Sequence, residues 1–148
     1  MPTQAPVPTD YAKLTYMCGR FERSIPIDVI IGNFRVNNAS IEMAPNYNVA
    51  PSQDVLIIYV DHEGNRQLAA CSWGFLPSWA KEPSMAHKMI NARAETVATK
   101  PAFRDAFRRY RCLVVADGFY EWEKEREEES AFLCPPQIRE VVRICRTL

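Results

Sequence analysis

The sequence lacks a long hydrophobic run, and it lacks an excess of charge of either sign. No window approaches the roughly 20 apolar residues of a transmembrane helix, and the proline-containing first 16 residues have no apolar core of a secretory signal. The 18 basic and 18 acidic residues give a formal net charge of zero, so any nucleic-acid binding must come from a local basic face. We therefore expect an intracellular protein without a membrane partner, nuclear in a eukaryote and cytoplasmic in a bacterium.

The sequence has only two histidines, and its five cysteines show no spacing typical of a metal site or a disulfide framework. His62 lies in an expected turn and His87 in an expected loop, so neither has an obvious metal partner and both are expected to be solvated. The cysteines form no C-x-x-C spacing and are odd in number: Cys18, Cys71, Cys112, Cys134 and Cys145. We expect reduced thiols and no structural zinc.

The 148 residues, 47% of them hydrophobic, are enough for one domain with its own core. Ser24 is expected to cap a helix over Ile25 to Phe34, whose apolar residues recur at helical spacing. A β-branched run over Val55 to Val60, a turn over 61–65 and a second strand over Gln67 to Trp73 predict a β-hairpin.

The second half of the chain mixes the same kinds of element. The apolar residues of 74–89 follow neither the helical nor the strand periodicity, which predicts an irregular surface loop. Pro101 opens a helix, whose expected apolar face is Phe103, Ala106, Phe107 and Tyr110. Two further strands, Cys112 to Ala116 and Phe119 to Trp122, are joined by the turn pair Asp117-Gly118. Helices intermixed with antiparallel strands indicate an α+β fold.

The ends of the chain differ in character from its middle. We expect residues 1–16 to be a disordered leader and residues 17–124 to be the folded domain. Residues 125–148 are expected to be a divergent, charged tail. This tail includes a short amphipathic helix with Ile138, Val141, Val142 and Cys145 on one face.

Cys18 is the first residue with candidate chemistry, because it follows Met17 and precedes a glycine. A chain begun at Met17 would lose that methionine and expose an N-terminal cysteine, whose amine and thiol condense with an aldehyde through an imine to a thiazolidine. An internal cysteine has no such amine and keeps only a nucleophilic thiol. Two alternatives remain open: Cys18 is a small buried apolar residue, or it is the nucleophile of a thiol peptidase with His87 as base.

Glu121 is the second candidate, since strand alternation places it beside Phe119 and sends Tyr120 and Trp122 to the opposite face. If that face is buried, desolvation raises the pKa of the carboxyl and suits it to proton transfer; if not, Glu121 faces water on an edge strand. Asn91 and Arg93 would share a face on an extended strand, where they could orient a sugar hydroxyl and hold a phosphate.

Aromatic residues flank the expected loop, and their role stays open at this stage. Trp73, Phe75 and Trp79 either stack on unpaired bases or anchor the core and the loop.

Five segments, taken together and in order, identify a family. They are Met17-Cys18-Gly19-Arg20-Phe21, Tyr47-Asn48-Val49-Ala50-Pro51, Trp73-Gly74-Phe75-Leu76-Pro77-Ser78-Trp79, Asn91-Ala92-Arg93-Ala94-Glu95-Thr96 and Ala116-Asp117-Gly118-Phe119-Tyr120-Glu121-Trp122. On these segments the chain, from Met17 to about Lys124, resembles the SRAP family, also called abasic-site processing proteins.

The resemblance implies a DNA-damage function. Its members crosslink through an N-terminal cysteine to the ring-opened sugar of an abasic site in single-stranded DNA, which makes such DNA the expected partner, and they have been linked to peptidase and lyase activity. It implies no metal or organic cofactor. It also implies a mixed, mainly antiparallel sheet or partial barrel with flanking helices.

Carried over residue by residue, the resemblance implies the following roles. Cys18 would be the nucleophile, Asn91 would orient the sugar or the amine, and Glu121 would move protons. The residues that match DNA-lining positions or the aromatic segment of the family are Arg20, Asn48, Pro51, Arg93, Trp73 and Trp79.

Two departures from the family pattern limit what the resemblance implies. Residues 1–17 precede Cys18, so thiazolidine chemistry requires a start at Met17 or removal of this leader. After Lys124 the family's later strands and its histidine motif have no counterpart, so we expect an incomplete fold. The alternatives are a non-catalytic remnant that binds single-stranded DNA and a thiol peptidase-like protein.

Overall fold

The computed structural model describes residues 19–37, 40–125, 128–134 and 142–144. Its elements, in chain order, are β1 (Arg20–Arg23), α1 (Ile27–Phe34), β2 (Asn46–Val49), β3 (Asp54–Val60), β4 (Arg66–Ser72), the 3₁₀ helix η2 (Pro83–Lys88), α2 (Ala94–Val97), α3 (Arg104–Arg109), β5 (Arg111–Val114), β6 (Gly118–Glu125), β7 (Glu128–Cys134) and β8 (Val142–Ile144). Within these ranges, none of the helices has the length and hydrophobicity that a membrane span requires.

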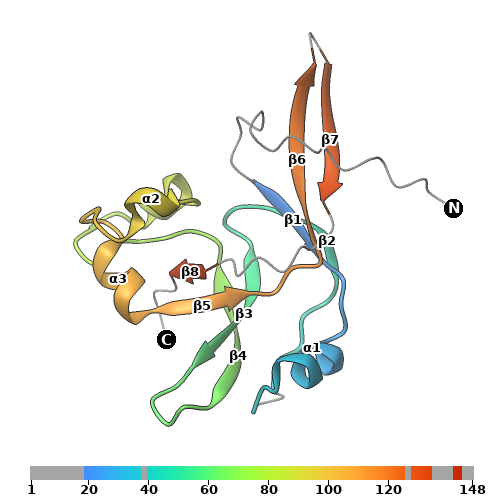
Figure 1. Cartoon of the computed structure of the whole chain (residues 1–148), viewed down its shortest axis with the longest axis vertical. Coiled ribbons are helices and arrows are strands. Elements are labelled where there is room, and N and C mark those ends of the chain that lie inside the picture. The colour runs from blue at the N-terminus through green and yellow to red at the C-terminus, as the bar shows by residue number, and fades with distance from the viewer. Residues whose placement is uncertain (1–18, 38–39, 126–127, 135–141, 145–148) are drawn as a thin grey trace, which may run out of the picture.

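The strands form two four-stranded sheets (Figure 1). Sheet A has the order β2-β1-β6-β7 and sheet B the order β4-β3-β5-β8, and every pairing is antiparallel. The expected α+β class with mainly antiparallel sheets is confirmed. Within the described residues the two sheets are open and close no barrel.

The hairpin expected over residues 55–73 is confirmed and spans residues 54–72. Strands β3 and β4 pair along their full lengths, from Asp54 opposite Ser72 to Val60 opposite Arg66. The carboxylate of Asp61 accepts hydrogen bonds from the backbone N–H groups of Glu63 and Asn65, which closes the turn. Gly64 has φ +85°, a left-handed conformation that favours glycine.

The turn pair Asp117-Gly118 does not make the tight hairpin that its sequence suggests. Strand β5 lies in sheet B and β6 in sheet A, so this segment carries the chain from one sheet to the other. The backbone N–H of Asp117 donates to the carbonyl of Glu22 at 2.9 Å. The segment is thus fixed against β1, not folded back onto β5.

Ser24 is not the cap of α1, as the sequence suggested. The helix begins at Ile27, with Pro26 in the capping position. The Asp117 carboxylate instead accepts hydrogen bonds from the backbone N–H and the hydroxyl of Ser24 and from the backbone N–H of Ile25. Ser24 therefore links the entry of α1 to the crossover between the sheets.

Two hydrophobic clusters fill the interior. One joins the sheets, because it combines Phe21 and Val49 of sheet A with Val55 and Ile57 of sheet B around Trp73. The other packs Ile30 of α1 against the opposite face of sheet B, and its other buried members are Val36, Leu56, Ile58, Leu68 and Val115. Each fully buried aliphatic side chain contributes roughly 1.5–3 kcal/mol.

The last described segments are strands. Val142 lies in β8, opposite Leu113 of β5, and not in the amphipathic helix expected there. Pairing with β5 overrides the helical spacing of the segment. Ile138, Val141 and Cys145 lie outside the described residues. The charge run over 121–129 falls mostly on β6 and β7, which pair from Phe119 opposite Cys134 to Glu125 opposite Glu128.

The irregular loop and the helix predicted between the hairpin and β5 are both present. The region 74–89 is largely irregular, with η2 as its only regular element. The helix after Pro101 is α3, and Phe103 beside it is buried. Tyr110, expected on the apolar face, is instead 56% exposed, because α3 ends one residue before it.

Candidate functional site

Glu121 lies on the buried face of β6. Its side chain is 8% exposed, and its Oε2 atom is buried without a hydrogen-bond partner among the described residues. Burial raises the pKa of the Glu121 carboxyl above its ordinary value of 4.5. The interpretation of Glu121 as a buried carboxyl is confirmed, and such a group keeps its proton to a higher pH than a surface glutamate.

The start of β1 lies beside this carboxyl. Arg20 pairs with Tyr120, the neighbour of Glu121, and Phe21 pairs with Phe119. In sheet A, β1 is an interior strand between β2 and β6. Cys18 precedes β1 by two residues in the sequence and lies outside the described residues.

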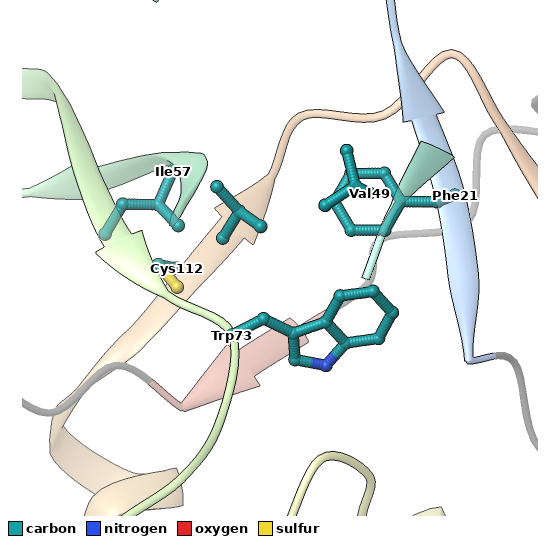
Figure 2. Close-up of a cluster of buried hydrophobic side chains, with 6 residues drawn as sticks. Phe21, Val49, Ile57, Trp73 and Cys112 are labelled. Carbon is teal, nitrogen blue, oxygen red and sulfur yellow. The ribbon is translucent and has the colours of Figure 1, made fainter. Parts of the chain in front are cut away.

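Trp73 positions the segment that carries Asn91. Its indole N–H donates to the carbonyl of Ile90 at 3.2 Å. The ring is 3% exposed and contacts the ring of Phe21, with centroids 5.1 Å apart. Figure 2 shows Trp73 in the cluster, with Phe21 on one side and Cys112 on the other. A ring so deeply buried cannot stack on a base, so Trp73 is a core residue and the expectation that it contacts DNA is corrected.

The same cluster brings the segments of Asn91 and Glu121 into one region. Ile90, which directly precedes Asn91, and Phe119, on the same strand face as Glu121, both pack against it. Asn91 is half-buried. The core that joins the two sheets thus also supports both candidate residues.

Arg93 does not lie on a strand with Asn91. The two residues belong to an irregular segment, and Arg93 occupies the N-terminal cap position of α2, where its side chain is exposed. The prediction that Asn91 and Arg93 share one face of a strand is therefore wrong. The backbone of Arg93 is extended, with φ −75° and ψ 130°, and α2 begins at the next residue.

The outer face of sheet A carries a second group of polar side chains. Arg20 donates from Nη1 to Oδ1 of Asn48 at 3.0 Å. The hydroxyl of Tyr120 donates to the carbonyl of Tyr47 at 2.8 Å, and the Tyr47 side chain is 63% exposed. Neither tyrosine was predicted to be a site residue; their position next to Asn48 and Glu121 in the family segments was the available signal.

Pro51 and Trp79 both lie outside the regular elements. Pro51 is half-buried in the turn between β2 and β3, and Trp79 is 58% exposed in the loop before η2. Trp79 therefore presents a ring to solvent, in contrast to Trp73 and Phe75, which are buried.

His87 is not simply solvated, as the sequence suggested. Its Nδ1 atom lies 2.5 Å from the hydroxyl oxygen of Ser52, which has φ +75° in the turn after Pro51. This contact ties η2 to the β2–β3 turn. His62 remains exposed in the hairpin turn, and no group of three metal-ligating side chains occurs in the described ranges.

Gly74 fixes the position of η2 from the other side. A Cβ atom placed at Gly74 would lie 2.8 Å from the carbonyl oxygen of Ala86. The backbone N–H of Phe75 also donates to the carbonyl of Met89 at 3.1 Å. The end of η2 is therefore held directly against the exit of β4, three residues before Asn91.

Curated proteins that are similar in sequence to this chain include several named abasic site processing proteins. "Abasic site processing protein YoaM" of Bacillus subtilis is 47% identical over 110 residues, covering 73% of this chain and 48% of that protein. "Abasic site processing protein YedK" of Escherichia coli is 32% identical over 133 residues, covering 78% of this chain and 52% of that protein. The chain thus spans about half the length of these curated relatives.

Solved structures support the fold. A protein from Bacteroides thetaiotaomicron superposes with a TM-score of 0.66 at 20% sequence identity, over 83% of this chain and 56% of that one. The sequence model of the family described as "SOS response associated peptidase (SRAP)" matches residues 17–144, which extends the similarity beyond Lys124 into β7 and β8. The chain therefore belongs to the SRAP family.

Proposed function

We propose that this protein processes abasic sites in single-stranded DNA by forming a covalent thiazolidine link through Cys18, once Cys18 is the N-terminal residue. The names of its relatives support abasic sites as the substrate. The observation that carries the proposed chemistry is the buried Glu121 carboxyl beside the start of β1, since a buried acid that retains its proton is what imine formation requires.

The reaction is a condensation with loss of one water molecule. The α-amine of Cys18 attacks the aldehyde carbon of the ring-opened sugar and gives a carbinolamine. Its hydroxyl leaves as water after accepting a proton from Glu121, and the nitrogen proton returns to the Glu121 carboxylate as the imine forms. The thiol sulfur then adds to the imine carbon while its proton passes to the nitrogen, which closes the thiazolidine ring.

The surrounding residues are assigned to binding. Asn91 orients the sugar or the amine, and Arg93, which is exposed, holds a phosphate. Arg20, Asn48 and Pro51 line the path of the strand. These roles come from the match to the family segments, and the placement of β1, β2 and the turn after it is compatible with them.

Trp79 and Trp73 have different parts in this proposal. Trp79 stacks on an unpaired base, because its ring is exposed. Trp73 acts indirectly: through its hydrogen bond to Ile90 it holds the segment of Asn91, and it touches no DNA.

The free amine at Cys18 provides the sharpest test. Chains begun at Met1 and at Met17 are incubated with abasic single-stranded DNA and analysed by denaturing gel and intact mass, after mass analysis has verified that Met17 is removed from the shorter chain. We expect an adduct only with the chain that exposes Cys18. Cys18→Ser in that chain is the matched control and gives none.

Two outcomes would count against the proposal. Equal adduct from both chains would show that no free amine is needed. Salt-dependent binding of undamaged strands without any adduct from the Met17 chain would instead indicate a DNA-binding protein that forms no covalent link.

A further inference from the structure

The charges of this neutral chain are strongly segregated. Residues 81–111 contain eight basic and three acidic residues, a net charge of +5, so the rest of the chain carries −5. All eight basic side chains of this segment are exposed. We name them the α2–α3 basic surface: Lys81, Lys88, Arg93, Lys100, Arg104, Arg108, Arg109 and Arg111.

This segment occupies one side of the molecule. Figure 1 shows α2 and α3 together beside the start of β5, away from the β6–β7 hairpin. The described residues provide a single ion pair, between Arg104 and Asp105 at 3.3 Å, with both side chains largely exposed. Tyr110, 56% exposed, lies between Arg109 and Arg111 in the sequence. Cations interleaved with an exposed aromatic ring are typical of surfaces that bind single-stranded nucleic acid.

Helix stability accounts for only part of this pattern. Arg108 and Arg109 lie in the last turn of α3, where positive charge is favourable beside the negative end of the helix dipole. Lys100 and Arg111 lie outside α3, and Lys81 precedes η2. A surplus of five positive charges needs a further reason.

We propose that the α2–α3 basic surface binds the phosphate backbone of the DNA strand that flanks the abasic nucleotide, as an extension of the candidate site. Arg93 joins the two, because it caps α2 and stands two residues from Asn91. In the sequence the cations continue from Arg93 through Lys100 to α3, which lies beside α2 (Figure 1), and they would supply countercharges to a strand leaving the site. This inference rests on the proposed function for the identity of the strand, whereas the surface itself is defined by charge and exposure.

The test compares two double variants of the full chain that remove the same charge. Arg108→Gln with Arg109→Gln alters the surface; Arg35→Gln with Arg66→Gln, at exposed positions at the end of α1 and the start of β4, is the matched control. Binding of an undamaged oligothymidine of about 20 nucleotides is measured by fluorescence anisotropy across a salt series.

Loss of two phosphate contacts changes the salt dependence and the affinity of binding by predictable amounts. For single strands each contact adds about 0.7 to the slope of log affinity against log salt, so the slope falls by about 1.4 and the affinity at 0.1 M salt by about 25-fold. The control keeps the wild-type slope, and Arg108→Lys with Arg109→Lys retains it because charge is preserved. If the glutamine variant does not fold, Lys100→Gln with Arg111→Gln replaces it with the same expectation.

An unchanged slope in the folded surface variant would overturn the proposal. So would equal losses in the surface variant and the control, or tighter binding of polyglutamate than of oligothymidine, which would assign the surface to an acidic protein. Failure of the proposed function is separate: a Met17 chain that binds oligothymidine through this surface but yields no adduct with abasic DNA would refute the covalent chemistry alone.

Discussion

Glu121 is a carboxyl group placed where the charged form is disfavoured. Burial raises its pKa in the folded protein, so between the ordinary value of 4.5 and the raised value the folded state binds more protons than the unfolded state. The free energy of unfolding must therefore fall as pH rises through that window. Above it, the folded state carries the full cost of an ionised Glu121, whose Oε2 atom has no hydrogen-bond partner in the part of the chain that the structure describes.

The prediction is that Glu121→Gln stabilises the protein at neutral pH, and that the gain disappears below pH about 4.5, where the wild-type carboxyl is neutral in both states. Urea unfolding at a series of pH values measures it. The same substitution should slow adduct formation by roughly 100-fold or more, because the proton donor is lost. Parallel stability profiles for the two proteins would contradict the assignment of Glu121 as a buried acid.

At the residue scale, the sequence predicted correctly which side chains share a strand face, because this depends only on alternation along the strand. Alternation along β6 was sufficient to place Glu121 beside Phe119, because successive side chains of a strand point to opposite faces. The same reasoning could not separate Trp73 from Trp79. Both belong to a segment without a period, and only the packing of Trp73 against Phe21 shows which ring is buried.

The contact between η2 and the exit of β4 is tight enough to test. We expect Gly74→Ala to push η2 outward, because its Cβ would lie 2.8 Å from the Ala86 carbonyl oxygen. The free energy of unfolding should fall by about 1–3 kcal/mol, as for overpacked sites. Adduct formation should also slow, since Asn91 follows η2 closely. Urea unfolding and the adduct rate are the measurements.

Gly32→Ala is the control for this change. Gly32 lies inside α1, and no neighbouring atom lies within 4 Å of the position that an alanine Cβ would occupy, so alanine should stabilise the helix by up to about 1 kcal/mol. If Gly74→Ala were as stable as Gly32→Ala, the close approach of η2 would not exist in solution.

Elements that local sequence specifies were predicted within a few residues. The hairpin of β3 and β4 has a β-branched strand and a glycine turn, both local signals. The Asp117-Gly118 pair misled because its effect depends on a distant partner: the carboxylate of Asp117 binds Ser24 and Ile25, more than 90 positions earlier in the sequence. Strand β8 was missed for the same reason, since its conformation depends on pairing with β5.

At the scale of the molecule, one cluster connects the two sheets, and Trp73 lies within it. We expect Trp73→Ala to lower the free energy of unfolding by about 3–5 kcal/mol. Amide protection should fall in both sheets together, because the substitution removes the contact between them. Hydrogen exchange and chemical unfolding measure these effects.

Trp79→Ala is the matched control, since its ring is exposed and its loss should change stability by no more than about 0.5 kcal/mol. Loss of protection confined to sheet B in Trp73→Ala would show that the sheets are not held together by this cluster.

The interior position of β1 has a mechanical consequence. In the proposed adduct, tension on the linked DNA would reach the chain just before β1, and its component along that strand is the load on sheet A. Since β1 is bonded to β2 on one side and β6 on the other, the load must shear both ladders simultaneously, whereas an edge strand can be peeled away one bond at a time. If the proposed link at Cys18 forms, β1 would therefore carry its tension across two hydrogen-bonded ladders.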